Sequence, residues 1–236
     1  MRLTTLATPE ALAERVAGTI AELLREAIGA RGVAHLALNG GSTPRPVYEQ
    51  LPALLDDWSA VHVWFGDERC VPPDDDESNF RLASETLISG AGLRDDQVHR
   101  MRGELGPEQG ALAYAAELAE HLELGDDGMP VLDVVHLGLG PDGHTASLFP
   151  DHDSLEVTGW ATIAERESPK PPPERISLSL GCLNAARRRL LHTVGEGKRE
   201  AVSHVLDAPD PHWPGSLLER FGLEVMVDDA AHPQQP

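Results

Sequence analysis

The chain has 236 residues, 41% of them hydrophobic, which is long enough for one large α/β domain or two small ones with a sizeable core. Its net charge of −20, from 39 Asp and Glu against 19 Lys and Arg, excludes nucleic acid and anionic membranes as natural partners because like charges repel. No apolar run is long enough to span a membrane, and the two cysteines form no disulfide framework, so we expect a cytoplasmic protein without a signal peptide.

The first half of the chain alternates strand and helix patterns. Residues 9–29 predict a helix with Thr8 as N-cap and Pro9 at its first position, because apolar side chains recur on one face. The elements predicted next are a strand at 33–38, a loop at 39–43, a helix from Pro44 capped by a threonine, a strand at 61–65, an acidic loop to Ser78 and a helix at 79–88.

The second half continues this alternation. We predict a short strand around 97–101, a helix at 107–122, a strand at 132–137, extended stretches at 160–164 and 175–180, a strand at 187–194, a helix at 197–207 and a strand at 223–227. The pattern is typical of βαβ units and predicts one α/β domain over residues 1–236, with a mainly parallel, twisted, Rossmann-like sheet and helices on both faces. We expect 168–174 to be a surface connection, and the last eight or so residues to be frayed.

Four motifs follow predicted strands: "NGGST" (39–43), "GDER" (66–69), "GLGPDGH" (138–144) and "GEGK" (195–198). Ligands bind at the carboxyl ends of the strands in open parallel sheets. Strand packing alone requires none of these residue types there. The four motifs together therefore predict one binding site.

The first motif has the features of a phosphate loop. Gly40 and Gly41 permit a close backbone approach, Asn39, Ser42 and Thr43 offer polar side chains, and the following helix start favours an anion. An ordinary tight turn with a threonine cap would also fit. A Walker A loop would not, because no Gly-Lys-Ser/Thr ends the motif.

The fourth motif supplies a cation for such a phosphate. Only two of the 19 basic residues are lysines, and one of them, Lys198, lies beside two glycines at a predicted helix start. A compact ammonium group suits a phosphate at this position. The alternative is a solvated lysine at a helix N-terminus.

The second motif places a carboxylate and a guanidinium, Asp67 and Arg69, just past an apolar strand. Such a pair can orient a base and hold substrate oxygens. A local surface ion pair is the alternative.

The third motif contains G-x-G-x-x-G, but its context does not suit a dinucleotide. It lies in mid-chain, has Pro141 inside the turn, and is followed by "LFPDHD" instead of a long apolar helix. The motif fits better with His144 as a general base, oriented by Asp142 or by Asp67, between which the sequence does not decide. His35, His62 and His136 lie inside strand patterns, so we expect them to pack or to face solvent.

Taken together, the motifs resemble the 6-phosphogluconolactonase branch of a family that also contains the glucosamine-6-phosphate deaminases. The resemblance spans roughly residues 8–228 and rests on "LNGGSTP", "FGDERCVPPDDDESNFRLASETL", "GLGPDGHTASLFP" and "GEGKREAV". The deaminases have a glutamate five residues after the histidine, where this chain has Phe149. The resemblance therefore implies lactone hydrolysis.

The resemblance implies hydrolysis of a sugar-phosphate lactone, 6-phospho-D-glucono-1,5-lactone, in the oxidative pentose phosphate pathway. His144 would act as general base, Asp142 or Asp67 would fix its tautomer, and Arg69 would hold the carbonyl or another substrate oxygen. The loop 39–43 and Lys198 would bind the 6-phosphate. No metal and no cofactor is implied, and we expect a monomer or a weak dimer.

Two other functions would fit part of this pattern. A glucosamine-6-phosphate deaminase or isomerase would release ammonia, and Phe149 argues against its acid–base relay. A non-catalytic sugar-phosphate-binding module would bind without turnover, and it would need neither the histidine nor the Asp-Arg pair.

Overall fold

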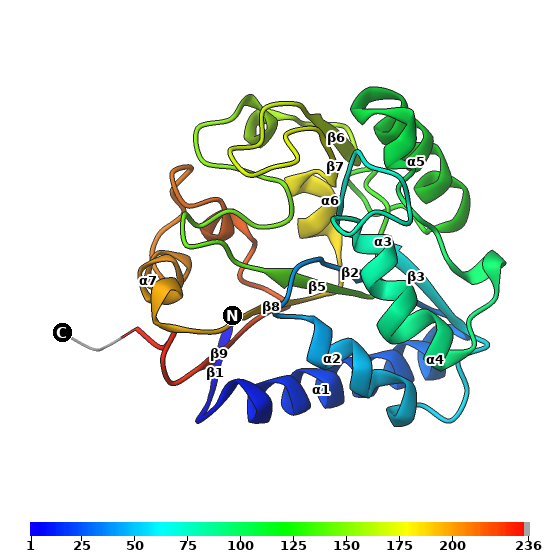
Figure 1. Ribbon diagram of the computed structural model, residues 1–236, viewed down its shortest axis with the longest axis horizontal. Coiled ribbons are helices and arrows are strands. Elements are labelled where there is room, and N and C mark those ends of the chain that lie inside the picture. Colours follow the sequence, from blue (N-terminus) through cyan, green and yellow to red (C-terminus); the bar gives the residue numbers. More distant parts are fainter. Residues whose placement is uncertain (234–236) are drawn as a thin grey trace.

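The computed structural model describes residues 1–233, and a six-stranded parallel sheet forms its centre (Figure 1). In spatial order the strands are β1 (Arg2–Leu6), β9 (Leu223–Asp228), β8 (Arg188–Thr193), β5 (Val134–Gly138), β2 (Ala34–Leu38) and β3 (Val61–Phe65). All neighbouring strands of this sheet run parallel, which confirms the predicted architecture.

A second, smaller sheet lies on the opposite side of the large sheet from α1 (Pro9–Arg31). Its strands pair antiparallel in the order β4 (Asp67–Arg69), β7 (Arg175–Leu178) and β6 (Thr162–Glu165). The last two correspond to the predicted extended stretches, whereas β4 forms from the "GDER" motif, which was predicted only to follow a strand. The motif is thus fixed by strand pairing and is not a free loop.

Helices cover both faces of the large sheet, as predicted (Figure 1). Besides α1 they are α2 (Arg45–Gln50), α3 (Asn79–Ala83), α4 (Ser89–Ala91), α5 (Pro107–His121), α6 (Leu180–Ala185) and α7 (Arg199–Leu206). A π-helical turn at Ser84–Ile88 joins α3 to α4. Short 3₁₀ turns lie at Leu51–Leu54, Asp95–Gln97, Gly103–Leu105, Asp153–Glu156, Glu196–Lys198 and Pro214–Leu217.

The long helix α1 begins and ends for local reasons that the sequence already indicates. The Thr8 hydroxyl accepts a hydrogen bond from the Ala11 N–H at 3.2 Å, and Pro9 takes the first position, which confirms the predicted cap. Gly32 ends the helix in a left-handed conformation (φ +79°), and its N–H donates to the Ile28 carbonyl.

Two strand predictions need correction. The strand β1 was not predicted, because its five residues alternate only weakly in hydrophobicity and are paired by β9 from the far end of the chain. The strand predicted around 97–101 is wrong. This segment makes only one bridge, between Val98 and Val63, after a 3₁₀ turn.

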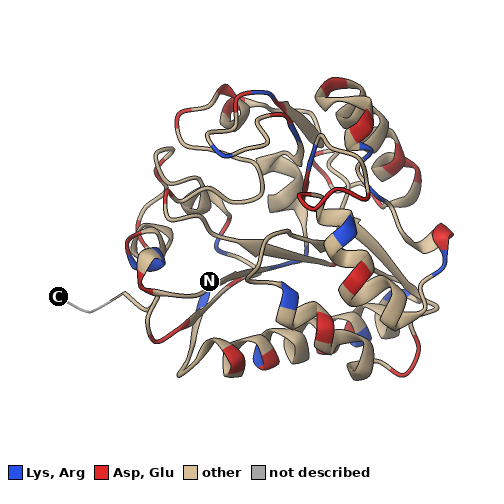
Figure 2. Cartoon of the chain, in the orientation of Figure 1, with Lys and Arg blue, Asp and Glu red and all other residues tan. Residues whose placement is uncertain are grey.

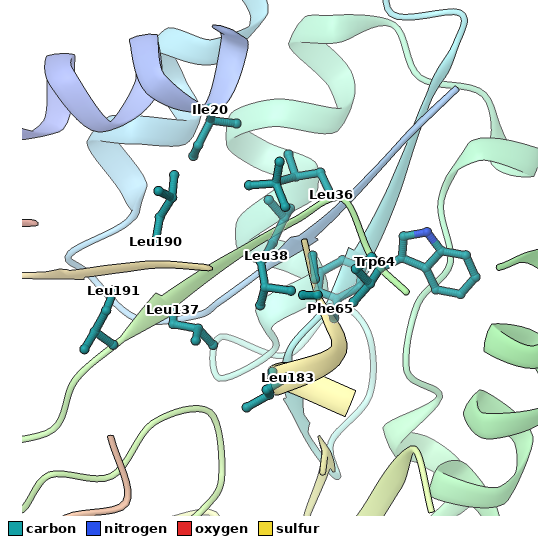
Figure 3. Packing of buried hydrophobic residues seen from close by; sticks show 14 of the residues in the cluster. Ile20, Leu36, Leu38, Trp64, Phe65, Leu137, Leu183, Leu190 and Leu191 are labelled. Atoms are coloured by element: carbon teal, nitrogen blue, oxygen red, sulfur yellow. The ribbon is translucent and has the colours of Figure 1, made fainter. Parts of the chain in front are cut away.

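One continuous cluster of buried apolar side chains fills the space between the sheet and the helices (Figure 3). Ile20 of α1 packs with side chains of the central strands, among them Leu36 and Leu190, and all three are fully buried. Burial of each such side chain stabilises the folded state by about 1.5–3 kcal/mol. The core therefore fixes the strand ends from which the site residues project.

No helix within residues 1–233 is long and apolar enough to cross a membrane.

The predicted frayed end lies partly outside the described residues, at 234–236. Just before them, Ala231 is fully buried and its N–H donates to Asp228 Oδ1 at 2.9 Å. Acidic residues are spread over α1, α5 and the loop before α3 (Figure 2).

Candidate active site

The predicted motifs meet in one pocket of about 240 Å³ at the carboxyl ends of β2, β5 and β8. Its lining contains nine of the ten predicted site residues: Asn39, Gly40, Gly41, Ser42, Thr43, Asp67, Arg69, His144 and Lys198. The tenth, Asp142, lies directly behind His144. Four further side chains that the sequence did not single out also line the pocket: Ala146, Arg175, His192 and Thr193.

The orientation of His144 is set by Asp142. Asp142 Oδ1 lies 2.5 Å from His144 Nδ1, and the same carboxylate oxygen lies 3.4 Å from the His144 backbone nitrogen. A carboxylate can only accept, so Nδ1 carries the proton and Nε2 of the neutral ring is left as a base. Of the two carboxylates that the sequence left open, Asp142 therefore makes this contact.

The turn that carries this pair depends on a glycine. A Cβ at Gly140 would lie 1.9 Å from His144 Nδ1 and 2.3 Å from Asp142 Oδ1, so any larger residue would displace both side chains. The loop after α7 supports the turn from behind, because the Gly215 N–H donates to the Gly143 carbonyl at 2.8 Å. Trp213 packs against Gly143, so the histidine is held on a rigid turn.

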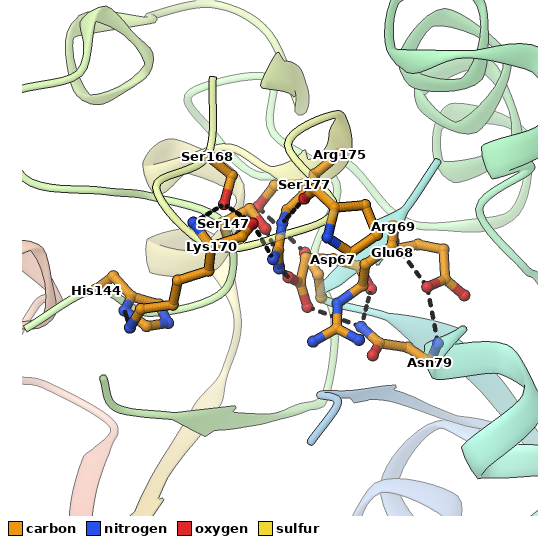
Figure 4. A network of polar contacts seen from close by, with 12 residues as sticks. Asp67, Glu68, Arg69, Asn79, His144, Ser147, Ser168, Lys170, Arg175 and Ser177 are labelled. Carbon is orange, nitrogen blue, oxygen red and sulfur yellow. Dashed lines mark hydrogen bonds and ion pairs between the residues drawn. The ribbon is translucent and has the colours of Figure 1, made fainter. Parts of the chain in front are cut away.

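Lys170, which the sequence did not single out as a site residue, lies beside His144 (Figure 4). Its ammonium group lies 3.1 Å from Asp142 Oδ2, and also 3.1 Å from His144 Nδ1. The second approach is no hydrogen bond while Nδ1 donates to Asp142, so Lys170 is paired with the carboxylate. The segment 168–174 does run along the surface, but it was wrong to read it as a connection only.

These charges act on the titration of the site. Burial raises the pKa of Asp142, but the hydrogen bonds and charges of His144 and Lys170 outweigh it and hold the pKa well below its usual range. Asp142 is thus ionised at neutral pH. Burial and then the charge of Lys170 lower the pKa of Lys198, against the opposing effect of Asp142. Lys170, Lys198 and Asp142 therefore form one charged cluster.

Asp67 lies across the pocket and makes different contacts. It is 5% exposed and accepts hydrogen bonds from the Ser147 hydroxyl at 2.7 Å and from Asn79 Nδ2 at 3.1 Å. Gly40 packs directly on this pair, since a Cβ there would lie 1.7 Å from Asn79 Oδ1. Asp67 thus ties the "GDER" motif to the glycine loop and to the segment after His144.

Glu68, between the two predicted residues of the motif, has a structural role. Its carboxylate accepts the backbone N–H groups of Asn79 and Phe80, each at 2.8 Å, and the Ser78 hydroxyl at 3.0 Å. Burial raises the pKa of Glu68, although these hydrogen bonds oppose the shift. It fixes the start of α3 and with it the position of Asn79.

Two guanidinium groups line the pocket from the small sheet. Arg69 donates to the Glu77 carbonyl at 2.6 Å. Arg175, on the neighbouring strand β7, donates to the Lys170 carbonyl at 2.9 Å and lies 3.9 Å from Asp67 Oδ2. Arg175 was missed because its sequence context, "PPPERIS", carries no motif. Its place follows only from the pairing of β4 with β7.

The glycine loop leaves its polar groups available. Gly41 has φ +94°, which the loop requires for its turn and which favours glycine. The helix α2 begins at Arg45 with Pro44 as N-cap and, within residues 1–233, without a side-chain capping bond, so the predicted threonine cap is wrong. The Thr43 hydroxyl is therefore not used as a cap, which removes the alternative of an ordinary capped turn.

Lys198 reaches the same side of the pocket from the turn before α7. Its ammonium group donates to the Leu139 carbonyl at 2.7 Å. Both lysines of the chain thus lie at one site, a signal present in the sequence but read there only for Lys198. Within residues 1–233 no group of three or more His, Cys, Asp or Glu side chains is arranged to hold a metal ion.

Residues 7–226 match the family described as glucosamine-6-phosphate isomerases/6-phosphogluconolactonase. A curated 6-phosphogluconolactonase of Streptomyces coelicolor is 39% identical over 96% of this chain and 92% of its own length.

Solved structures agree in fold and in length. A 6-phosphogluconolactonase structure from Shewanella baltica superposes with a TM-score of 0.84 and 33% identity, over 97% of either chain. The Trypanosoma brucei 6-phosphogluconolactonase gives 0.85 with 28% identity, over 98% of this chain and 97% of its own. The resemblance inferred from the four motifs is therefore confirmed over nearly the whole chain.

Proposed function

Because the chain belongs to the glucosamine-6-phosphate isomerase/6-phosphogluconolactonase family, we propose that it hydrolyses 6-phospho-D-glucono-1,5-lactone to 6-phospho-D-gluconate. The observation that carries the proposal is the Asp142–His144 pair at the edge of a pocket lined with cations. A base, an electrophilic wall and an anion site are the three parts that hydrolysis of a phosphorylated lactone requires.

His144 Nε2 acts as general base in this mechanism. It takes a proton from a water molecule whose oxygen attacks C1 of the lactone, forming the new C–O bond. The imidazolium is stabilised by Asp142, and it returns the proton to the ring oxygen as the C1–O5 bond breaks. The lactone is an activated ester, so neither a covalent nucleophile nor a metal is needed for this step.

Arg69 and Arg175 stabilise the negative charge that develops on the carbonyl oxygen. Both guanidinium groups line the same pocket as His144, and both project from the small sheet that faces it. Fixed donors of this kind act most strongly where water is excluded. Asp67 accepts a hydrogen bond from Ser147 and lies beside Arg175, so it helps to keep the two guanidinium groups in place.

The loop 39–43 and Lys198 bind the 6-phosphate. The loop supplies backbone N–H groups and the hydroxyls of Ser42 and Thr43, and Lys198 supplies a compact positive charge beside them. Binding energy from the phosphate then positions the reacting carbonyl. Such a local cationic site is required in a chain whose net charge of −20 repels anions.

The deaminase alternative is not favoured at residue 149. Phe149 is fully buried, and its ring packs 4.9 Å from the His144 ring. The guanidinium carbon of Arg175 lies 5.8 Å from the centroid of the same ring. An apolar ring in this position supplies no carboxyl group to open an amino sugar.

The proposal is tested with freshly generated 6-phosphoglucono-δ-lactone, the unphosphorylated lactone and glucosamine 6-phosphate. We expect fast hydrolysis of the first over the spontaneous rate, weak hydrolysis of the second and no ammonia from the third. In Lys198→Met the KM for the phosphorylated lactone rises while kcat changes little. Absence of acceleration over buffer would reject the proposal.

We further propose that the enzyme acts in the cytoplasm, as a monomer or weak dimer, with no nucleic-acid partner. Support comes from the acidic surface and from the cysteines, both of which are free thiols. Sedimentation at several protein concentrations, with and without added duplex DNA, tests the oligomeric state and the absence of DNA binding.

A further inference from the structure

A buried chain of hydrogen bonds runs beneath the pocket floor and ends at a pocket-lining histidine. Asn39 Oδ1 lies 2.9 Å from the Tyr48 hydroxyl, which lies 3.0 Å from His136 Nδ1. His136 Nε2 then lies 3.3 Å from His192 Nδ1, and the two rings are stacked with planes 12° apart. Tyr48, His136 and His192 are each at most 2% exposed.

The hydrogen-bond distances favour one direction of this chain. Tyr48 accepts from the Asn39 backbone N–H at 2.9 Å, and its single proton is placed on Asn39 Oδ1 at 2.9 Å, which is nearer than His136 Nδ1 at 3.0 Å or the Asn39 carbonyl oxygen at 3.2 Å. Its remaining lone pair then accepts from His136 Nδ1–H. His136 Nε2 is consequently an acceptor, and His192 must donate to it from Nδ1.

This direction leaves His192 Nε2 unprotonated. The atom is buried and has no hydrogen-bond partner within residues 1–233, although His192 lines the pocket. Burial lowers the pKa of His192 to about 4, against the effect of Asp228, so the ring is neutral at neutral pH. A buried acceptor without a partner is costly, so a hydrogen-bond donor is expected to approach this atom from the pocket.

We propose that His192 is a specificity-determining residue whose unprotonated Nε2 accepts a hydrogen bond from a ring hydroxyl of the bound sugar lactone, in a tautomer fixed by His136, Tyr48 and Asn39. This inference rests on the proposed lactonase function. The ligand group must be a donor, because an unprotonated nitrogen repels a phosphate oxygen. His192 therefore marks the hydroxyl side of the pocket.

The position of His192 fits this role. Its Cα is paired with that of Gly138, so it lies beside the end of β5, in a wall separate from the small sheet. Arg69, Arg175 and Lys198 can only donate hydrogen bonds, whereas each hydroxyl of the lactone also needs an acceptor. His192 supplies a neutral acceptor that does not add charge near His144.

Kinetics of two substitutions give the first test. His192→Leu removes the acceptor in a similar volume, and we expect KM for 6-phosphoglucono-δ-lactone to rise about tenfold with kcat little changed. His192→Gln, whose side-chain oxygen can replace Nε2, recovers part of this loss. His62→Leu removes a histidine from the far edge strand β3 and leaves the kinetics unchanged.

Substrate analogues test the hydroxyl directly. We would measure kcat/KM with 6-phosphorylated lactones lacking the 2-, 3- or 4-hydroxyl, for the natural protein and for His192→Leu. One analogue is expected to be insensitive to the substitution. The inference is wrong if His192→Leu lowers kcat/KM for all three analogues as much as for the full lactone. It is also wrong if His192→Leu has the same kcat/KM as the natural protein. The proposed function fails separately, if the natural protein hydrolyses none of them.

The tautomer is observable by ¹⁵N NMR of ring-labelled histidine. At pH 7 we expect His192 to be protonated at Nδ1, and the Nε2 resonance to shift on addition of 6-phosphogluconate. Tyr48→Phe, which keeps the ring but breaks the chain, is expected to mix the two tautomers. A proton on Nε2 of His192 in the natural protein would overturn the assignment.

Discussion

The pocket has two walls that differ in how the sequence encodes them. One wall comes from the loops that follow β2, β5 and β8 of the large parallel sheet, and it carries the glycine loop, His144 and Lys198. The other comes from the small sheet and the connection between its strands β6 and β7, and it carries Asp67, Arg69, Lys170 and Arg175. The position of the first wall follows from the order of the parallel strands. The position of the second follows from pairing between segments that are far apart in the chain.

The difference is chemical as well. The main-sheet wall holds the base and the anion site on backbone turns that admit only glycine at critical points. The small-sheet wall supplies charges that are locked by one another and by backbone carbonyls. We therefore expect substitutions in the first wall to act on geometry, and substitutions in the second to act through charge, on stability, on titration and on stabilisation of the transition state.

The largest effect is expected in the main-sheet wall, at the His144 turn. Gly140→Ala places a methyl group against His144 Nδ1 and Asp142 Oδ1, and kcat should fall at least about 100-fold because the base is misoriented. Steady-state kinetics measure the fall in kcat, and circular dichroism checks that the fold is intact.

A matched control is Gly18→Ala in α1, where nothing lies within 4 Å of the added Cβ. Activity should be unchanged there and stability higher by up to about 1 kcal/mol. If Gly140→Ala were as active as this control, the turn would not position the histidine.

An intermediate effect is expected in the small-sheet wall. Arg175→Met removes the positive charge beside Asp67 and the hydrogen bond to the Lys170 carbonyl, so we expect a stability loss of about 2–4 kcal/mol and a fall of roughly tenfold in kcat/KM. Urea denaturation measures the loss of stability, and steady-state kinetics measure the fall in kcat/KM.

Arg166→Ala serves as the control, because the ion pair of Arg166 with Glu108 is exposed to solvent and contributes little to stability. Equal stability losses in both variants would remove the distinction between the buried Arg175 and the exposed Arg166, which follows β6.

The smallest effect concerns the ion pair that joins the walls. The hydrogen bond of His144 and the charge of Lys170, 3.1 Å from Asp142 Oδ2, together outweigh burial and hold the pKa of this carboxyl well below its usual range. In Lys170→Met one of these two causes is lost, so the pKa of Asp142 should rise, which ¹³C NMR titration of the carboxyl groups measures.

Lys170→Arg keeps the charge and should retain the original pKa of Asp142. A pKa of Asp142 that stays in place in Lys170→Met, or falls, would mean that the lysine does not act on this carboxylate.

The two walls also show what the sequence could predict. Every residue of the glycine loop, His144 and Lys198 was predicted, because the carboxyl ends of parallel strands meet at one edge of the sheet. Asp67 and Arg69 were predicted as residues after β3, although the strand β4 that holds them was not.

Lys170, Arg175 and His192 were missed, for two physical reasons. The first two reach the site through antiparallel pairing of β7 with β4, over about 100 residues of chain, which no local pattern encodes. His192 lies inside a strand pattern, where a histidine is usually a packing residue. Only its partners, His136 and Tyr48, distinguish it, and they are visible only in the folded chain.

The most direct test of the account is the rate at which His144→Ala hydrolyses fresh 6-phosphoglucono-δ-lactone, compared with the natural protein and with buffer. The account predicts that kcat falls by about 10²–10⁴-fold while KM changes little, because the substitution removes only the base. A variant that keeps the kcat of the natural protein would contradict the account, since the Asp142–His144 pair would then not take part in the reaction.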